Sequence, residues 1–141
     1  MPIRIAIVDD VAELRREIAN LLKNDSNMKL EGEFADPESA LIHLPITKPD
    51  VVLMDIQFPG MSGVECASRL KAIIPTTQLM MLTVFDDYEL IFQSLQAGAT
   101  GYLLKKSIST KLLDSIRELH EGGVGPGRSL ESPEVQAIRL D

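Results

Sequence analysis

The sequence has little of what several protein classes require. It contains a single cysteine, Cys66, which allows no internal disulfide and fits a reducing compartment. Acidic residues outnumber basic ones by 21 to 14, and a net charge of −7 argues against a broad surface that grips a nucleic-acid backbone. No apolar run approaches membrane-spanning length, and the start lacks the apolar core of a signal peptide. We therefore expect a cytoplasmic protein that makes no membrane contact.

The remaining composition is that of one globular domain followed by a linker. The chain of 141 residues is long enough for one full core and too short for two ordinary domains. Five glycines and prolines fall between Gly122 and Gly127, and Ser132-Pro133-Glu134 then resembles a helix start. We expect residues 1–121 to fold, and residues 122–141 to be either a linker and connector or a disordered terminus.

The stretch Val51–Gly63, VVLMDIQFPGMSG, organises the rest of the sequence. Four apolar residues run directly into Asp55 and are bounded by Pro49-Asp50 and Pro59-Gly60. A short apolar run between such breakers predicts a strand that is buried on both faces. Asp55 is then expected where this strand ends.

Strand patterns alternate with helix patterns along the chain. The expected strands are Ile3–Val8, Lys29–Ala35, Val51–Met54, Leu79–Thr83 and Gly101–Leu104. The expected helices are Val11–Asn24, one from an Asp36 cap to Leu44-Pro45, Val64–Ile74 after a Ser62 cap, one from an Asp86 cap to Gly98, and one from a Ser109 cap to Gly122-Gly123. Such alternation predicts an α/β fold, a doubly wound (βα)5 parallel sheet with helices on both faces. The pattern does not fix the strand order.

Four of the expected strands end in polar side chains that would meet at one edge of the sheet. These are Asp9-Asp10, Asp55, Thr83 and Lys105. Crowded carboxylates repel one another unless a cation relieves them, and Mg²⁺ prefers oxygen ligands of this kind. A hydroxyl and an ammonium group beside the metal suit a phosphoryl group, and Asp55 is then the candidate nucleophile. Each residue alone has an ordinary structural explanation, such as a turn, cap or solvated lysine.

Together these residues carry a recognisable pattern. The sequence resembles the receiver domain of bacterial two-component response regulators from Ile3 to Gly123, and most closely the LuxR/NarL-like subfamily. The matching segments are VDD at Val8–Asp10, LMDIQFPGMSGVE at Leu53–Glu65, LT at Leu82-Thr83 and QAGATGYLLKK at Gln96–Lys106. The resemblance implies a flavodoxin-like sheet in the order 2-1-3-4-5.

The resemblance also assigns a role to each site residue. For Mg²⁺ it implies Asp10 and Asp55 as direct ligands, Gln57 through its backbone carbonyl, and Asp9 through water. For the phosphoryl group it implies Asp55 as phosphoacceptor, with Thr83 and Lys105 binding the phosphoryl oxygens. Thr83 and Tyr102 are the implied switch pair, with Tyr102 rotating inward when Thr83 moves.

The implied function is a phosphorylation-dependent switch in phosphorelay signalling. A sensor histidine kinase would donate the phosphoryl group, and DNA would be reached only through a C-terminal helix-turn-helix domain outside this chain. Phosphorylation would favour a homodimer, for which Tyr88, Leu90 and the Ile108–Leu119 segment are candidate surfaces, although core packing explains most of them. The chain would not be an enzyme beyond its own phosphorylation and dephosphorylation.

Three positions depart from the family pattern. Val84 and Phe85 follow Thr83 where smaller or polar residues are common, and they could slow hydrolysis by narrowing the approach of water. Lys106 replaces a frequent proline, which leaves the geometry of the preceding peptide bond open.

Several other functions remain open on the sequence alone. A stand-alone receiver would act by protein–protein contact, and a degenerate receiver would do so without phosphorylation. A haloacid-dehalogenase-type phosphatase also uses aspartate and Mg²⁺, but its nucleophile follows the first strand and its acid pair comes late. A flavin-binding module would need a hydroxyl-rich phosphate loop after the first strand, where Asp9-Asp10 would repel phosphate.

Overall fold

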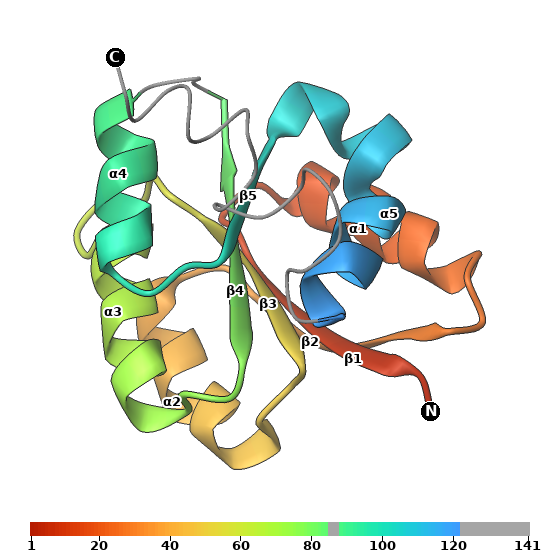
Figure 1. Ribbon diagram of the computed structural model, residues 1–141, viewed down its shortest axis with the longest axis horizontal. Helices are drawn as coiled ribbons and strands as arrows, with labels where there is room; N and C mark the ends of the chain where they lie inside the picture. The colour runs from red at the N-terminus through yellow and green to blue at the C-terminus, as the bar shows by residue number, and fades with distance from the viewer. Residues whose placement is uncertain (85–87, 122–141) are drawn as a thin grey trace.

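The protein forms one parallel five-stranded sheet between two helical layers (Figure 1), in a computed structural model that describes residues 1–84 and 88–121. The strand order is β2-β1-β3-β4-β5, which confirms the predicted (βα)5 fold and the order that the resemblance implied. The strands are β1 Ile3–Val8, β2 Met28–Phe34, β3 Val51–Asp55, β4 Gln78–Thr83 and β5 Gly101–Leu104. The helices are α1 Ala12–Lys23, α2 Pro37–Thr47, α3 Gly63–Ile73, α4 Tyr88–Gln96 and α5 Ile108–His120, with a 3-10 turn at Lys105–Ser107.

Alternate strand residues build two separate cores, because successive side chains of a strand point to opposite faces. Ile5, Ile7 and Leu53 belong to the core under α1 and α5, whereas Val8 and Met54 belong to the core under α2, α3 and α4. This alternation decides where the polar strand ends point. Asp55 continues the series of Val51 and Leu53, and Asp9 continues that of Ile5 and Ile7. Both side chains therefore emerge on the α1/α5 side of the sheet.

Strand β2 lies at the edge of the sheet. Its pairing with β1 passes from Ile5↔Leu30 to Ala6↔Gly32, so Glu31 is an extra residue in the ladder. A side chain at Gly32 would place its Cβ 2.9 Å from the Phe34 ring, which favours glycine beside this bulge. Beyond the bulge the regular pairing resumes, and the Phe34 carbonyl accepts a hydrogen bond from the Asp9 N–H at 3.0 Å.

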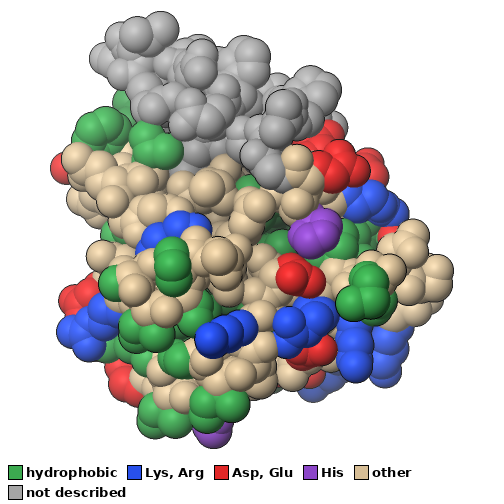
Figure 2. Space-filling model, turned by 60° about the horizontal axis from the view of Figure 1, so that its bottom comes forward, with side chains coloured by type: hydrophobic (Ala, Val, Ile, Leu, Met, Phe, Trp, Pro, Cys, Tyr) green, Lys and Arg blue, Asp and Glu red, His purple; other side chains and the backbone are tan. Residues whose placement is uncertain are grey.

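Arg4 forms a network of hydrogen bonds with acidic residues at the amino-terminal ends of the strands. The Nε of Arg4 donates to Glu31 Oε2 at 2.9 Å, and the Arg4 backbone N–H donates to Asp50 Oδ2 at 2.9 Å. The guanidinium also donates to the Thr47 and Lys48 carbonyls at the end of α2. Figure 2, which brings this end of the molecule forward, shows Lys and Arg side chains beside Asp and Glu side chains.

Three helix ends form as the sequence predicts. Asp36 accepts a hydrogen bond from the Ser39 N–H at 2.7 Å, with Pro37 at the first helical position. Ser62 accepts one from the Glu65 N–H at 3.1 Å. Gly98 follows α4 with a φ of 103°, a left-handed conformation that disfavours other residues.

The predicted end of α2 is wrong, because the helix continues through Pro45 to Thr47 and ends at Lys48 in a left-handed conformation. Pro45 has no N–H to donate to the carbonyl one turn earlier, yet the helix runs past it. The Lys48 N–H still bonds the Leu44 carbonyl, and Arg4 binds the last two carbonyls. A side chain from β1 thus supplies the cap that the local sequence lacks.

The predicted start of α5 is also wrong. The 3-10 turn Lys105–Ser107 leads directly from β5 into α5, so Ser109 lies inside the helix and Ser107 occupies the N-cap position without a side-chain hydrogen bond. The Lys105–Lys106 peptide bond is trans, as are the other peptide bonds of the described residues. The predicted Asp86 cap, the Gly122-Gly123 stop and the linker at 122–141 lie outside the described residues.

Helix α4 exposes large apolar side chains to solvent in addition to those that it buries. Ile91 is buried, whereas Tyr88 and Phe92 are about half exposed, at 51% and 47%. Leu90, a predicted surface candidate, is partly buried and packs against the core under α2, α3 and α4. Among the helices of residues 1–84 and 88–121, none has the length and apolar character needed to cross a membrane.

Candidate functional site

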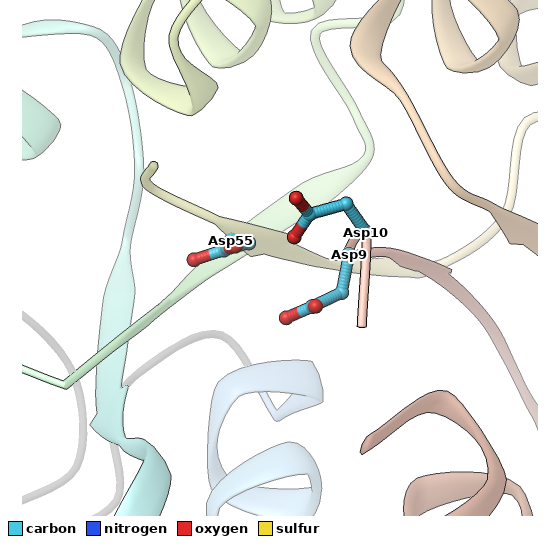
Figure 3. A group of neighbouring side chains, drawn as sticks. All are labelled: Asp9, Asp10 and Asp55. Atoms are coloured by element: carbon cyan, nitrogen blue, oxygen red, sulfur yellow. The ribbon is translucent and has the colours of Figure 1, made fainter. Parts of the chain in front are cut away.

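Three carboxylates gather at the carboxyl-terminal ends of the two central strands. Asp9 and Asp10 directly follow β1, and Asp55 is the last residue of the adjacent strand β3, where Val8 pairs with Met54. One oxygen from each carboxylate lies within 4.8 Å of the others. Figure 3 shows the Asp9 and Asp10 side chains reaching from the end of β1 toward Asp55. The structure thus brings these three predicted acids together at one edge of the sheet.

The three acids differ in burial. Asp9 is fully buried and Asp55 is 4% exposed, whereas Asp10 is exposed. The Val11 N–H donates to Asp9 Oδ1 at 2.8 Å, which holds the turn between β1 and α1. Asp9 Oδ2 lies 3.1 Å from Lys105 Nζ and accepts no hydrogen bond from any other described residue. One oxygen of a buried carboxylate is thus left with a single cation beside it.

Lys105 brings the compensating positive charge to this pocket. It follows β5 as the first residue of the 3-10 turn, and its Nζ lies 3.1 Å from Asp9 and 3.3 Å from Asp55. Burial alone would lower the pKa of Lys105, but the hydrogen bond with Asp9 and the charges of both acids raise it. Lys105 is therefore a cation held between two buried carboxylates.

Asp55 remains insufficiently compensated despite this lysine. Burial raises its pKa, and the neighbouring Asp9 charge raises it further, against the opposing effects of Lys105 and the Gln57 N–H. That N–H donates to Asp55 Oδ1 at 3.3 Å, which is a long hydrogen bond. A pocket with three carboxylates and one ammonium group favours an added cation. Oxygen donors alone match Mg²⁺ better than the softer transition metals.

Thr83 and Tyr102 lie at the other side of Asp55. Asp55 pairs with Leu82 in β4, so Thr83 is one residue beyond it, and Thr83 pairs with Leu104 of β5. Thr83 is buried, and Tyr102 is partly buried against the core under α2, α3 and α4. Tyr102 pairs with Met81, which lies two residues before Thr83 in β4. The Thr83 and Tyr102 side chains therefore share the face of the sheet that α2, α3 and α4 cover.

Comparison with known proteins identifies the family. Residues 5–117 match the response regulator receiver domain. The chain belongs to this family. The receiver domain is 38% identical to the uncharacterized transcriptional regulatory protein YxjL of Bacillus subtilis (strain 168) over 85% of this chain and 55% of that protein. It is 37% identical to the oxygen regulatory protein NreC of Staphylococcus aureus (strain JH9) over 84% of this chain and 55% of NreC.

Solved structures give the same result. A LuxR-family two-component response regulator from Aurantimonas sp. SI85-9A1 matches with a TM-score of 0.86 and 25% identity over 100% of both chains. The receiver domain of the putative response regulator NarL from Mycobacterium tuberculosis matches with a TM-score of 0.81 and 28% identity over 86% of this chain and 98% of that one. These neighbours agree with the predicted LuxR/NarL-like resemblance. The chain spans about half the length of the curated relatives it matches.

Arg15 also contacts the acidic pocket, although no sequence pattern marks it as a site residue. Arg15 of α1 donates from Nη1 to the Asp9 backbone carbonyl at 2.6 Å, and its Nε lies 3.7 Å from Glu33 of β2. The only signal in the sequence is a basic residue six positions after Asp9, which is common on a helix surface. The contact depends on the path of the β1–α1 turn, so spacing alone does not predict it.

Proposed function

We propose that this receiver domain is a phosphorylation-dependent signalling switch that accepts a phosphoryl group on Asp55 from a partner histidine kinase. The observation that supports this most is the position of Asp55. Its carboxylate lies beside those of Asp9 and Asp10 and 3.3 Å from Lys105 Nζ. A nucleophilic oxygen, a cation site and an ammonium group are the parts that phosphoryl transfer to a carboxylate needs.

The residues present fit Mg²⁺. Asp10 and Asp55 would bind it directly with the Gln57 carbonyl, and Asp9 would act through water. The exposure of Asp10 beside two buried acids supports this division, because a hydrated ion can approach from the open side. When bound, Mg²⁺ offsets the negative charge that gathers on the phosphoryl oxygens.

The chain's own groups would carry the transfer. An Asp55 carboxylate oxygen forms the new bond to phosphorus while the bond from phosphorus to the donor histidine nitrogen breaks. Lys105 then moves from the Asp55 carboxylate to a phosphoryl oxygen, which needs little motion because Nζ already lies between Asp9 and Asp55. The Thr83 hydroxyl donates to another phosphoryl oxygen.

The response would pass through the last two strands and helices. Thr83 and Tyr102 share one face of β4 and β5, beside α4. Movement of Thr83 toward the phosphoryl group would leave space for the Tyr102 ring, and the surface of α4, β5 and α5 would change with it. This is a two-state equilibrium that a local charge biases.

The output of the whole protein is proposed from its relatives. One of them is named as a transcriptional regulatory protein, and this chain spans about half its length. We infer a cytoplasmic transcription regulator in which residues 122–141 begin a connector to a helix-turn-helix domain, with dimerisation on phosphorylation. The alternative is a stand-alone receiver that acts by protein–protein contact.

Labelling with acetyl phosphate tests the proposal. The wild-type protein should acquire one phosphoryl group only when Mg²⁺ is present, and Asp55→Asn should acquire none. Asp114→Asn is a matched control, since Asp114 is exposed on α5 and should label like the wild type. Labelling of Asp55→Asn at the wild-type rate would contradict the proposal. Sustained hydrolysis of a small phosphate ester would instead favour the phosphatase alternative.

A further inference from the structure

Arg15 touches the acidic pocket from behind, through the backbone. Its guanidinium bonds the carbonyl of Asp9, which belongs to the peptide group that joins Asp9 to Asp10. We propose that Arg15 is a positioning residue for the cation site, which fixes this peptide group so that the Asp10 carboxylate faces Asp55. The inference rests on the proposed Mg²⁺ site.

Three hydrogen bonds fix Asp9, through its backbone N–H, its Oδ1 and its carbonyl. Its N–H donates to the Phe34 carbonyl at 3.0 Å, and its Oδ1 accepts from the Val11 N–H at 2.8 Å. Its carbonyl accepts the 2.6 Å bond from Arg15 Nη1. Rotation of the Asp9–Asp10 peptide would redirect the Asp10 side chain, and that rotation would break the bond to Arg15.

Asp10 depends on its backbone more than the other two acids do. Lys105 pairs with Asp9 and Asp55, and within the described part of the chain no group forms a hydrogen bond or ion pair with the Asp10 carboxylate. Repulsion from two neighbouring carboxylates within 4.8 Å would turn an unrestrained Asp10 away. Arg15 opposes this turning with a charged hydrogen bond, which is stronger than a neutral one.

Arg15 is poorly placed to serve its own helix. A positive charge in the first turn lies at the positive end of the helix dipole, where it is unfavourable. Its guanidinium is turned back over the β1–α1 turn, with Nε 3.7 Å from Glu33 Oε1 of β2. The adjacent Arg16 is exposed and makes no ion pair or side-chain hydrogen bond with the described residues. Arg16 therefore provides the matched control.

The test is a calorimetric Mg²⁺ titration of the wild type, Arg15→Gln, Arg16→Gln and Asp10→Asn. We expect Arg15→Gln to bind Mg²⁺ about tenfold more weakly than the wild type, the usual effect of removing a partner that orients a ligand. Arg16→Gln makes the same charge change one residue away and should bind like the wild type. Urea unfolding in EDTA should show that both arginine variants are fully folded under the titration conditions, which separates positioning from loss of the folded state.

Two outcomes overturn the inference alone. Either Arg15→Gln binds Mg²⁺ as the wild type does, or Arg16→Gln weakens binding equally, which would show a net-charge effect. If the wild type itself fails to bind Mg²⁺, or Asp10→Asn binds normally, the proposed cation site has failed first. Should Arg15→Gln not fold, Arg15→Lys keeps the charge without the planar donor fork and should still bind more weakly than the wild type. Wild-type affinity in Arg15→Lys would then overturn the inference.

Discussion

The two ends of the sheet use charged residues in opposite ways. At the amino-terminal end, Arg4 bonds Glu31 and the last carbonyls of α2, and the hydrogen bond from Arg4 holds the pKa of Glu31 below its usual range. At the carboxyl-terminal end, Asp9, Asp10 and Asp55 crowd together around one lysine, and burial raises the pKa of Asp55. One end is balanced in charge, and the other is left short of a cation.

The charged residues at the amino-terminal end contribute to stability, whereas those at the carboxyl-terminal end suit ligand binding. Ion pairs that complete a helix end and an edge strand contribute to the folded state and need no ligand. Carboxylates whose pKa is raised by burial and by one another cost the folded state free energy, and such groups concentrate at functional sites. The deficit at the carboxyl-terminal end is what a bound cation and a phosphoryl group would use.

The largest expected effect comes from removing the Lys105 ammonium group at the carboxyl-terminal end of the sheet. Lys105→Met should slow acetyl-phosphate labelling by about 100-fold, the usual loss when one group that stabilises developing negative charge is removed. The adjacent Lys106→Met removes the same charge from an exposed position and should label at the wild-type rate. Equal rates in the two variants would show that position in the pocket does not matter.

A smaller effect is expected at the amino-terminal end of the sheet, where the charges are balanced. Arg4→Met should lower the free energy of unfolding by about 1–2 kcal/mol, because it removes charged hydrogen bonds to Glu31 and α2 at a partly exposed site. Urea denaturation measures this, with Lys29→Met as a control, since Lys29 is mostly exposed and 3.9 Å from Glu31. Mg²⁺ affinity and labelling should not change. A loss of either would mean that the two ends are coupled.

The smallest effect compares the pH dependence of the two ends. Because the folded protein raises the pKa of Asp55, ionised Asp55 costs stability above that pKa, and the cost disappears as the pH falls through it. Asp55→Asn should therefore raise the unfolding free energy in EDTA near neutral pH and raise it less in acid. Glu31→Gln should do the opposite, since a lowered pKa gives stability that is present at neutral pH and lost as the pH falls. Urea unfolding from acid to neutral pH measures both variants. A change in unfolding free energy in the same direction for both would contradict the comparison.

The sequence predicts the architecture because its local signals agree. Apolar runs such as Val51–Met54 end in polar residues, and helix caps such as Asp36 and Ser62 occur where helices begin. These are short-range patterns, which spacing and composition can reveal. The gathering of Asp9, Asp10, Asp55 and Lys105 follows from the same logic, because parallel strands share one carboxyl-terminal edge.

The remaining features depend on partners distant in sequence. The continuation of α2 past Pro45 depends on Arg4, which lies some 40 positions earlier and binds its last carbonyls. The bond from Arg15 to the Asp9 carbonyl depends on the path of one turn, and the start of α5 at Ile108 depends on how the 3-10 turn leaves β5. No periodicity encodes these contacts, so a single sequence does not predict them.

The most direct test of a cation-dependent acyl-phosphate pocket is a calorimetric titration with Mg²⁺ followed by beryllofluoride. We predict one Mg²⁺ site in the wild type, beryllofluoride binding only when Mg²⁺ is present, and loss of the beryllofluoride step in Asp55→Asn. A correctly folded wild-type protein that binds neither, or an Asp55→Asn variant that binds both unchanged, would contradict the assignment of this pocket.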